Sequence, residues 1–193
     1  MNPPHDFKIS NVAQLKSLSS PIRQEIVDTV NALGICSVPE VAAALNRPAD
    51  GLYYHVRALL RSGLLREAGR RRQARHSELL LRSPTKRVMR LQYVPADPRN
   101  VREVTRIARG MLRGAERDFA RGFRAPHVVV RGNRRNLNAS RQKAWLSHGE
   151  IREVNQLLGR LQQIFHTARR RKDAEFCSLT LVLAPLTGDA EPE

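Results

Sequence analysis

The segment from Arg47 to Leu65, which reads RPADGLYYHVRALLRSGLL, constrains the fold of this chain more than any other. Pro48 and Asp50 suit the first turn of a helix, and Gly63 is a residue type that ends helices in the left-handed conformation. Between them, apolar residues recur at helical spacing and predict one buried stripe: Leu52, Val56, Leu59 and Leu60. The segment therefore predicts a short amphipathic helix that is opened by a turn and closed by glycine.

The other faces of this predicted helix carry two tyrosines and two arginines, which are Tyr53, Tyr54, Arg57 and Arg61. Such a face suits an element that docks in a DNA groove, where base edges and phosphates are contacted together. It equally suits an ordinary amphipathic helix with a solvated basic side. The surrounding segments decide between the two interpretations.

Three shorter helices are predicted before this one. The first covers 11–18. The second begins at Ser20-Pro21 and ends at Gly34, where serine caps the helix and proline takes the first turn. The third covers Val38 to Leu45, where Ser37 and Glu40 form a capping box. Two helices joined by a short turn constitute a helix-turn-helix, in which the third helix crosses the DNA backbone and the fourth enters the major groove.

A β-hairpin is predicted directly after the recognition helix. Its strands cover Leu64 to Ala68 and Arg75 to Leu81, and residues 69–74 form a turn that carries three consecutive arginines. A hairpin in this place is a wing, and its cationic tip would lie along phosphates or enter a narrow minor groove. The expected wing contacts are Arg70, Arg71, Arg72 and Arg75. The alternative is a solvated hairpin with surface charge.

Residues 12–82 contain LKSLSSPIRQEIVDTVNALGICSVPEVAAAL followed by LYYHVRALLRSGLL, and this region resembles the arsenic-repressor-like (ArsR-type) winged-helix transcription regulators. The resemblance implies a homodimeric, cytoplasmic bacterial repressor or activator. It also implies base contacts from five positions of the recognition helix: Asp50, Gly51, Tyr53, Tyr54 and Arg57.

Three further residues match the family pattern. His55 matches the family histidine and is expected to be a buried helix residue that hydrogen-bonds to a neighbouring backbone. Ser20 and Arg23 match the Ser-Pro-x-Arg start, where Arg23 is either structural or a phosphate contact. The Cys-x-Cys pair of the metal-sensing members is missing, because only Cys36 precedes the third helix, and the six histidines show no ligand spacing. No metal and no cofactor are expected.

The net charge of +16 predicts a polyanionic partner. The excess is localised: residues 47–87 and 99–135 each contain 11 basic and 3 acidic side chains, whereas the remainder contains 12 of each. If the chain merely had a general preference for arginine, its basic residues would be spread more evenly along the sequence.

Other function classes find little support. Two distant cysteines imply no disulfide framework and favour a reducing compartment. The polar N-terminus shows no signal peptide, and no apolar run reaches the 18 residues that a membrane span needs. No catalytic triad, phosphate loop or pair of carboxylates in a plausible cleft is present, so an enzyme is not expected.

A long helix is predicted from Pro98 to about Phe123, after a connector. One side shows the 3-4 spacing of a helix-packing seam, expected to meet a dimer partner: Val101, Val104, Ala108, Met111 and Ala115. The opposite side carries an arginine stripe, which either contacts flanking DNA or an acidic surface of the dimer, or is solvated: Arg102, Arg106, Arg109, Arg113, Arg117, Arg121 and Arg124.

The C-terminal region is predicted to be a small α/β unit. Ser147 and Glu150 form a capping box that begins a helix with apolar residues from Ile151 to Phe165. Val128 to Val130 suggests a short strand, and the segment Phe176 to Leu183, FCSLTLVL, predicts a buried strand. Trp145 and Phe176 are expected in a core. The unit would either cover the dimer or form a pocket for a small-molecule effector.

The expected fold class is α+β and mainly helical. A winged helix-turn-helix domain covers 11–83, a connector 84–97, a dimerisation and effector region 98–186, and a disordered tail 187–193. The expected function is that of a sequence-specific, DNA-binding transcription regulator that acts as a homodimer on double-stranded operator DNA in the bacterial cytoplasm. The alternative is a structural nucleic-acid-binding protein, of nucleoid or replication-initiator type, with little sequence specificity.

Overall fold

The computed structural model describes residues 7–73 and 76–186. Its elements follow in the order β1 (Phe7–Ile9), α1 (Val12–Leu18), α2 (Pro21–Leu33), β2 (Cys36–Ser37), α3 (Val38–Leu45), α4 (Asp50–Arg61), β3 (Arg66–Gln73), β4 (His76–Arg82), β5 (Met89–Leu91), α5 (Pro98–Gly122) and α6 (His148–Thr167).

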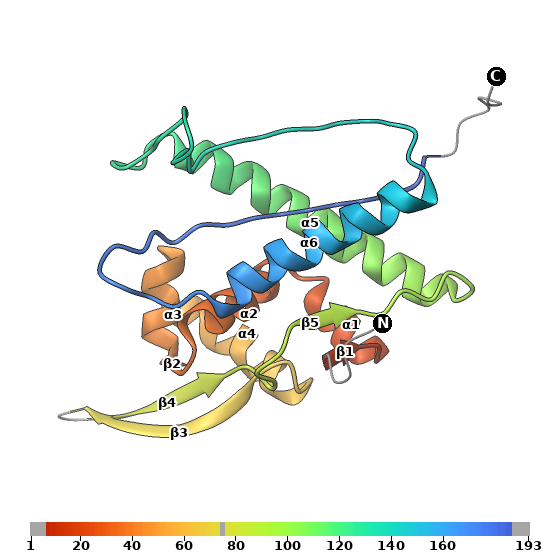
Figure 1. Ribbon diagram of the computed structural model, residues 1–193. Coiled ribbons are helices and arrows are strands. Elements are labelled where there is room, and N and C mark those ends of the chain that lie inside the picture. Colours follow the sequence, from red (N-terminus) through yellow and green to blue (C-terminus); the bar gives the residue numbers. More distant parts are fainter. Residues whose placement is uncertain (1–6, 74–75, 187–193) are drawn as a thin grey trace.

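The core lies among α1, α2, α3, α4 and the first half of α5, as the arrangement in Figure 1 shows. The predicted helical stripes converge there, because one face of each amphipathic helix must be buried. The largest fully buried side chains come from these helices and the segments that follow them: Leu15, Ile26, Val30, Val41, Leu59, Leu64, Leu65 and Leu81. The predicted helices before and including α4 are present.

α4 begins slightly later than the sequence suggests. Ala49 is its N-cap residue, so Pro48 precedes the helix instead of standing in its first turn. Asn46 ends α3 in the left-handed conformation, which allows the tight turn into α4. Gly63 has a φ of 71°, and Leu64 N–H donates to the Leu59 carbonyl oxygen there, so the predicted glycine stop is confirmed.

Capping at the start of α2 differs from the prediction. Ser20 is the N-cap residue and Pro21 the first helical residue, but the serine side chain makes no capping hydrogen bond. At the start of α3, by contrast, the Ser37 N–H donates to the Glu40 carboxylate at 2.7 Å. The capping signal therefore located both helix starts.

The hairpin is longer than predicted. β3 and β4 pair antiparallel, with a bulge between Glu67 and Gly69, and β2 joins the other edge of β4. Residues 69–73, expected in a turn, belong to β3, since the strand continues past the bulge. Gln73 pairs with His76, and the tip at 74–75, which includes Arg75, lies outside the described residues.

A second, two-stranded sheet was not predicted. β1 pairs parallel with β5 in the register Phe7↔Met89 to Ile9↔Leu91, and Ile9 is buried. Residues 7–9 therefore form a strand ahead of the first predicted helix, and the predicted connector contains a strand. The signal was weak because both strands have only three residues.

α5 is present as predicted, but its seam faces a different partner. The helix packs on α1 and α2 of the same chain, and Val104 and Met111 contact the intramolecular core. Val101, at the start of the seam, is exposed. The expectation that this seam meets a dimer partner is therefore wrong for its central residues.

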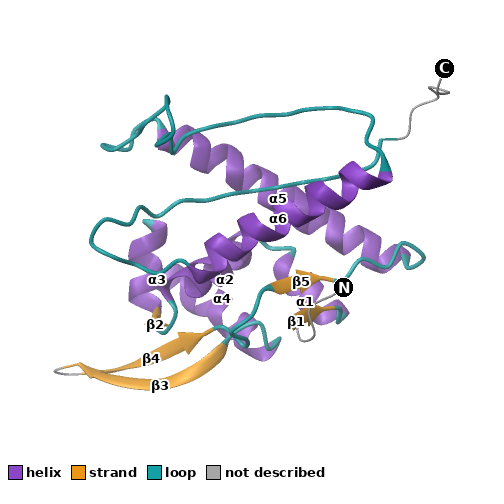
Figure 2. Ribbon diagram, viewed as in Figure 1, coloured by secondary structure: helices purple, strands orange, loops and turns teal. Residues whose placement is uncertain are grey.

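The C-terminal region lacks the predicted strands. α6 is present with its Ser147–Glu150 capping box, yet none of its residues is buried. Residues 128–130 and 176–183 form no strand among the described residues, and both stretches belong to the loops in Figure 2. Trp145 is 82% exposed and Phe176 64%, so neither is a core residue of this chain. The predicted tail at 187–193 lies outside the described residues.

No helix among residues 7–73 and 76–186 is both long and apolar enough to cross a membrane.

Candidate nucleic-acid interface

The outer face of α4 presents aromatic and basic side chains together. Leu52, Val56 and Leu59 are buried, which orients the helix. All five predicted base-contact residues are exposed, as is Arg61, and Tyr54 is the most exposed tyrosine of the helix at 65%. The exposed set is Asp50, Gly51, Tyr53, Tyr54, Arg57 and Arg61.

A shallow depression of about 430 Å³ lies on this face, lined by Tyr54, Arg57, Leu60 and Arg61. It combines an aromatic ring with two guanidinium groups. Guanidinium groups donate hydrogen bonds to phosphates and to guanine edges, and the tyrosine adds a flat apolar surface.

His55 lies on the inner side of the same helix. It is half-buried, and its ring meets that of Tyr54 edge-on, with 5.5 Å between the centroids. Burial, and to a lesser degree the positive charge of Arg23, lowers the pKa of His55 below its ordinary value. Its Nδ1 atom is buried and has no hydrogen-bond partner among the described residues, so this atom does not make the hydrogen bond to a neighbouring backbone that was expected of the ring.

The hairpin divides its three arginines between two faces, because successive side chains of a strand alternate. Arg70 and Arg72 are exposed. Arg71 turns to the other face, where it forms ion pairs with Glu78 at 2.9 Å and with Glu40 at 3.1 Å. The sequence could not reveal this division while residues 69–74 were expected to form a turn.

Glu40 connects the hairpin to α3. The hydrogen bond from the Ser37 backbone N–H, together with Arg71, lowers the pKa of the Glu40 carboxyl. The same carboxylate thus caps α3 and holds Arg71, so the hairpin is fixed relative to the helix-turn-helix.

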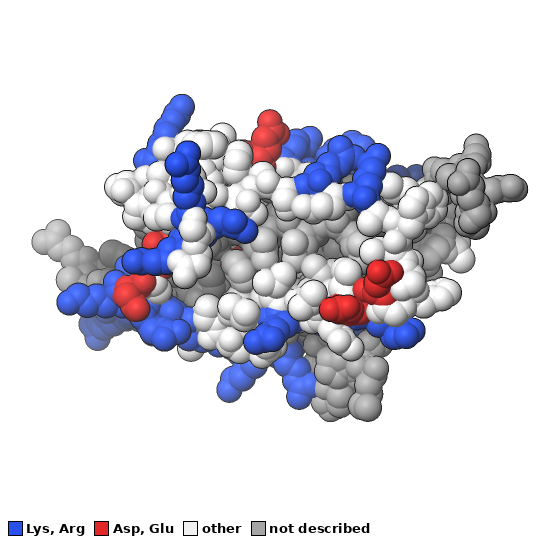
Figure 3. Space-filling view, turned by 45° about the horizontal axis from the view of Figure 1, so that its top comes forward, with Lys and Arg blue, Asp and Glu red and all other residues white. Residues whose placement is uncertain are grey.

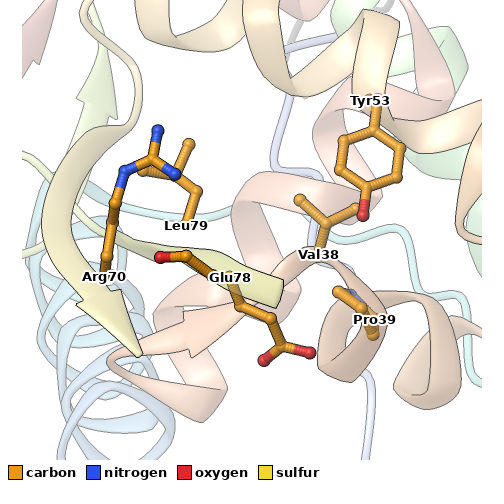
Figure 4. Close-up of a pocket in the computed structure, with 7 residues that line it drawn as sticks. Val38, Pro39, Tyr53, Arg70, Glu78 and Leu79 are labelled. Carbon is orange, nitrogen blue, oxygen red and sulfur yellow. The ribbon is translucent and has the colours of Figure 1, made fainter. Parts of the chain in front are cut away.

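A second depression of about 180 Å³ lies between the hairpin and the two helices, and Figure 4 shows its lining. Tyr53 from α4 and Val38 and Pro39 from the start of α3 form one side. Arg70 and Leu79, on neighbouring strands, lie opposite them. The depression therefore marks where the aromatic face of α4 meets the exposed arginines of the hairpin.

Three consecutive residues of α2 fix the elements around them. Arg23 donates to the Ser17 carbonyl oxygen at 3.3 Å and is partly buried, so its contacts in this chain are structural. The buried Gln24 amide donates to the carbonyl oxygens of Leu18 at 2.6 Å and Ile107 at 3.2 Å.

The Glu25 carboxylate bridges two elements. Its oxygens lie 2.7 Å from Arg117 on α5 and 3.3 Å from Arg47 in the turn before α4. Sequence reasoning missed Gln24 and Glu25, since polar residues on a predicted helix carry no signal of their distant partners.

The predicted arginine stripe on α5 is only partly available to a ligand. Arg117 is taken up by Glu25 and Asp118, and Arg106 pairs with the buried Glu103 at 3.1 Å. Glu103 also accepts a hydrogen bond from the Ser19 hydroxyl at 2.7 Å. The other members of the stripe are exposed: Arg102, Arg109, Arg113, Arg121 and Arg124.

Within the described part of the chain, no group of three or more His, Cys, Asp or Glu side chains could hold a metal ion. Cys36 is buried in the core, and burial together with the nearby Glu40 raises the pKa of its thiol to about 11.

Residues 18–68 match the family model of a helix-turn-helix domain. The match covers the end of α1 through the first residues of β3, including the whole of α2, α3 and α4. It supports a DNA-binding helix-turn-helix regulator, and it leaves the hairpin beyond residue 68, α5 and α6 outside. No curated protein matches the chain.

Proposed function

We propose that this protein is a sequence-specific transcription regulator that binds double-stranded operator DNA as a homodimer. The observation that carries the proposal is the exposed face of α4 on a matched helix-turn-helix, with Tyr53, Tyr54 and Arg57 exposed. Tyr53 also lines a depression together with Arg70 of the hairpin. A helix of this motif enters the major groove, which is the groove that distinguishes all four base pairs.

The recognition helix supplies the reading of sequence. Arg57 would donate two hydrogen bonds to a guanine edge, and Tyr53 and Tyr54 would contact neighbouring bases or sugars. Asp50 and Gly51 stand at the N-terminal end of α4, the end that base contacts favour in this motif. Gly51 carries no side chain, so the backbone there can approach DNA closely.

The hairpin acts as a wing that supplies affinity. Arg70 and Arg72 are the phosphate contacts within the described residues, and Arg75 is proposed as a third, at the tip. Arg71 instead positions the wing, because its guanidinium is held by Glu40 and Glu78. A contact to phosphate supplies affinity regardless of sequence and makes binding dependent on salt.

The resemblance to ArsR-type regulators supports a cytoplasmic repressor or activator in a bacterium, associated with the nucleoid when bound. A small-molecule effector fits the same resemblance. The arginine stripe of α5 remains a second basic face, of which Arg102, Arg109, Arg113 and Arg121 are exposed.

The test begins with selection of binding sites from random double-stranded DNA by the full-length protein. We expect an enriched palindromic site, bound at least about 10³-fold more tightly than random DNA at the same salt concentration. A ratio near one would replace the proposal with the alternative, a structural nucleic-acid protein without sequence preference.

Two sets of variants separate the roles of helix and wing. Arg57→Ala should cost about 1–3 kcal/mol on the selected site and relax the preference at one base position. Arg70→Ala with Arg72→Ala should weaken binding to all sequences and reduce the slope of log K against log salt by about two. Arg66→Ala, at an exposed arginine at the start of β3, is the matched control. An unchanged slope in the wing variant would contradict the phosphate assignment.

A further inference from the structure

α6 is a long amphipathic helix that approaches α2, but its apolar face stays exposed. It has 20 residues and a clear apolar face, yet none of its residues is buried. Only Val154, Leu158, Gly159 and His166 reach intermediate exposure. An amphipathic helix is stabilised mainly by packing of its apolar face, and α6 lacks that packing within the chain.

The segment Phe176–Leu183 shows the same deficiency in extended form. Its sequence FCSLTLVL is typical of a buried strand, because β-branched and other apolar residues dominate it. In the structure its apolar side chains are exposed, and its backbone makes no hydrogen bond to any other described residue. Residues 176–186 contain no charged side chain at all.

The two features follow one another along the chain. Figure 1 shows the chain turning back after α6 and running extended toward the start of that helix. In Figure 3, which turns the top of Figure 1 forward by 45°, uncharged side chains cover much of the middle of the face, and most of the Lys and Arg side chains lie around it.

The exposed apolar area is large. The exposed large apolar side chains between residues 145 and 186 are Trp145, Leu146, Ile151, Leu157, Leu161, Ile164, Phe165, Phe176, Leu179, Leu181, Val182, Leu183 and Leu186. Their exposed areas sum to roughly 1,000 Å², which is comparable with the area that one partner contributes to a stable protein–protein interface.

We propose that residues 145–186 form the dimer interface, and that a second copy of this chain covers the apolar face of α6 and pairs with Phe176–Leu183. The proposal rests on the proposed function only in that both require a homodimer. A two-fold axis places the two copies of Phe176–Leu183 antiparallel, so each supplies the hydrogen-bond partners that the other lacks.

A second copy fits better than another ligand for three reasons. DNA is excluded as the occupant of Phe176–Leu183, because the segment has no charge. Each copy has an unpaired extended segment, Phe176–Leu183, and an exposed apolar face on α6. Two copies can therefore pair their extended segments and cover each other's apolar faces. A paired two-stranded ribbon is stable only when a helix or another strand covers it, which α6 provides.

The test measures the mass of the full-length protein by sedimentation at several concentrations. We expect a dimer for the wild type at about 10 µM. Leu157→Glu with Leu161→Glu, and separately Leu179→Glu with Leu181→Glu, should raise the dissociation constant at least about 100-fold by placing charges in the interface. Gln156→Glu with Gln163→Glu adds the same charges to the polar side of α6 and should leave the dimer unchanged.

These variants should not unfold the monomer, since every substituted leucine is exposed within the chain. Far-ultraviolet circular dichroism checks that expectation. A monomeric wild type at 100 µM would overturn the proposal, and so would a dimer that survives both leucine variants. A dimer that survives both leucine variants would contradict only the proposed interface and would leave the proposed DNA binding intact. A wild-type dimer that is broken by the variants but binds all DNA sequences equally would contradict only the proposed function.

The two cysteines give an independent measurement. Cys177 is exposed within the chain, whereas Cys36 is buried and its pKa is about 11. A thiol reagent therefore reports on Cys177. Its labelling rate should fall at least about tenfold between dilute and concentrated protein, because dimerisation buries the segment. A rate independent of concentration in a dimeric protein would place the interface elsewhere.

Discussion

The N-terminal part of the molecule, up to the end of α5, and the part that follows it contrast in one property. The first packs the apolar stripes of α1 to α4 and the first half of α5 into a single core. The second has a helix with an equally clear apolar face and no buried residue. Amphipathic periodicity thus marks a face that will be covered, and it does not say whether the same chain covers it.

The two arginine-rich segments, by comparison, resemble each other, because each contains both ion-paired and exposed arginines. Around the hairpin, Arg71 is held by acids while Arg70 and Arg72 are exposed. On α5, Arg117 is held by Glu25 while Arg109 and Arg113 are exposed. In both segments, some basic residues fix the architecture and the others form the surface.

The largest expected effect is a difference in the loss of unfolding free energy between two leucine variants, one from each part of the molecule. Leu59 is 0% exposed and Leu161 is 39% exposed. Leu59→Ala should lower the free energy of unfolding by about 2–5 kcal/mol, because it opens a cavity in the core. Leu161→Ala in dilute, monomeric protein should change it by less than about 0.5 kcal/mol. Urea unfolding measures both, and equal losses would show that α6 has a core of its own.

Two helical glycines should respond in opposite directions. A Cβ at Gly110 would lie 2.8 Å from the Gln24 amide nitrogen, which is buried and donates to two carbonyl oxygens. Gly110→Ala should therefore lower the free energy of unfolding by about 1–2 kcal/mol, since lost hydrogen bonds exceed the gain in helix propensity. Gly159, on α6, has no atom within 4 Å of its Cβ position.

Gly159→Ala is accordingly the matched control and should stabilise the protein by up to about 1 kcal/mol. The measurement is thermal or urea unfolding of both variants. If Gly110→Ala also raised the free energy of unfolding, the Gln24 side chain could move aside without loss. The close packing of α5 on α2 would then contribute less to stability than the structure indicates.

The smallest expected effect is the pH dependence of the unfolding free energy that His55, in the N-terminal part, contributes. The pKa of His55 is lowered, mainly by burial, so the folded state binds a proton less readily than the unfolded state. The unfolding free energy should therefore fall as the pH drops below about 6.5, the ordinary histidine value, and gain nothing from this group above it. Urea unfolding at pH 7.5 and 5.5 should show a weaker pH dependence for His55→Gln than for the wild type.

An identical pH dependence in both proteins would mean that His55 has the same proton affinity in the folded and unfolded states. A steeper dependence in the variant would reverse the sign and contradict the influence of burial and of Arg23.

Much of the packed part could be predicted from local signals. The apolar spacing of Leu52, Val56 and Leu59 and the glycine at 63 located α4, and caps located α3 and α6. Partners across the chain were not predictable, because nothing in the sequence distinguishes Arg71, which is ion-paired, from Arg70, which is exposed. The strand at Phe176–Leu183 was predicted from its composition, but a strand also needs a neighbour, and the single chain supplies none.

The carboxylate of Glu25 has a consequence for regulation. It holds Arg47, just before α4, and Arg117 on α5 at the same time. A DNA phosphate that contacted Arg47 would compete with Glu25 for that guanidinium. Because coupling free energies are reciprocal, a ligand that displaced Arg117 would then change the affinity for DNA by the same factor by which DNA would change the affinity for that ligand. The Glu25 carboxylate would in this way couple α5 to the proposed DNA-binding face of α4.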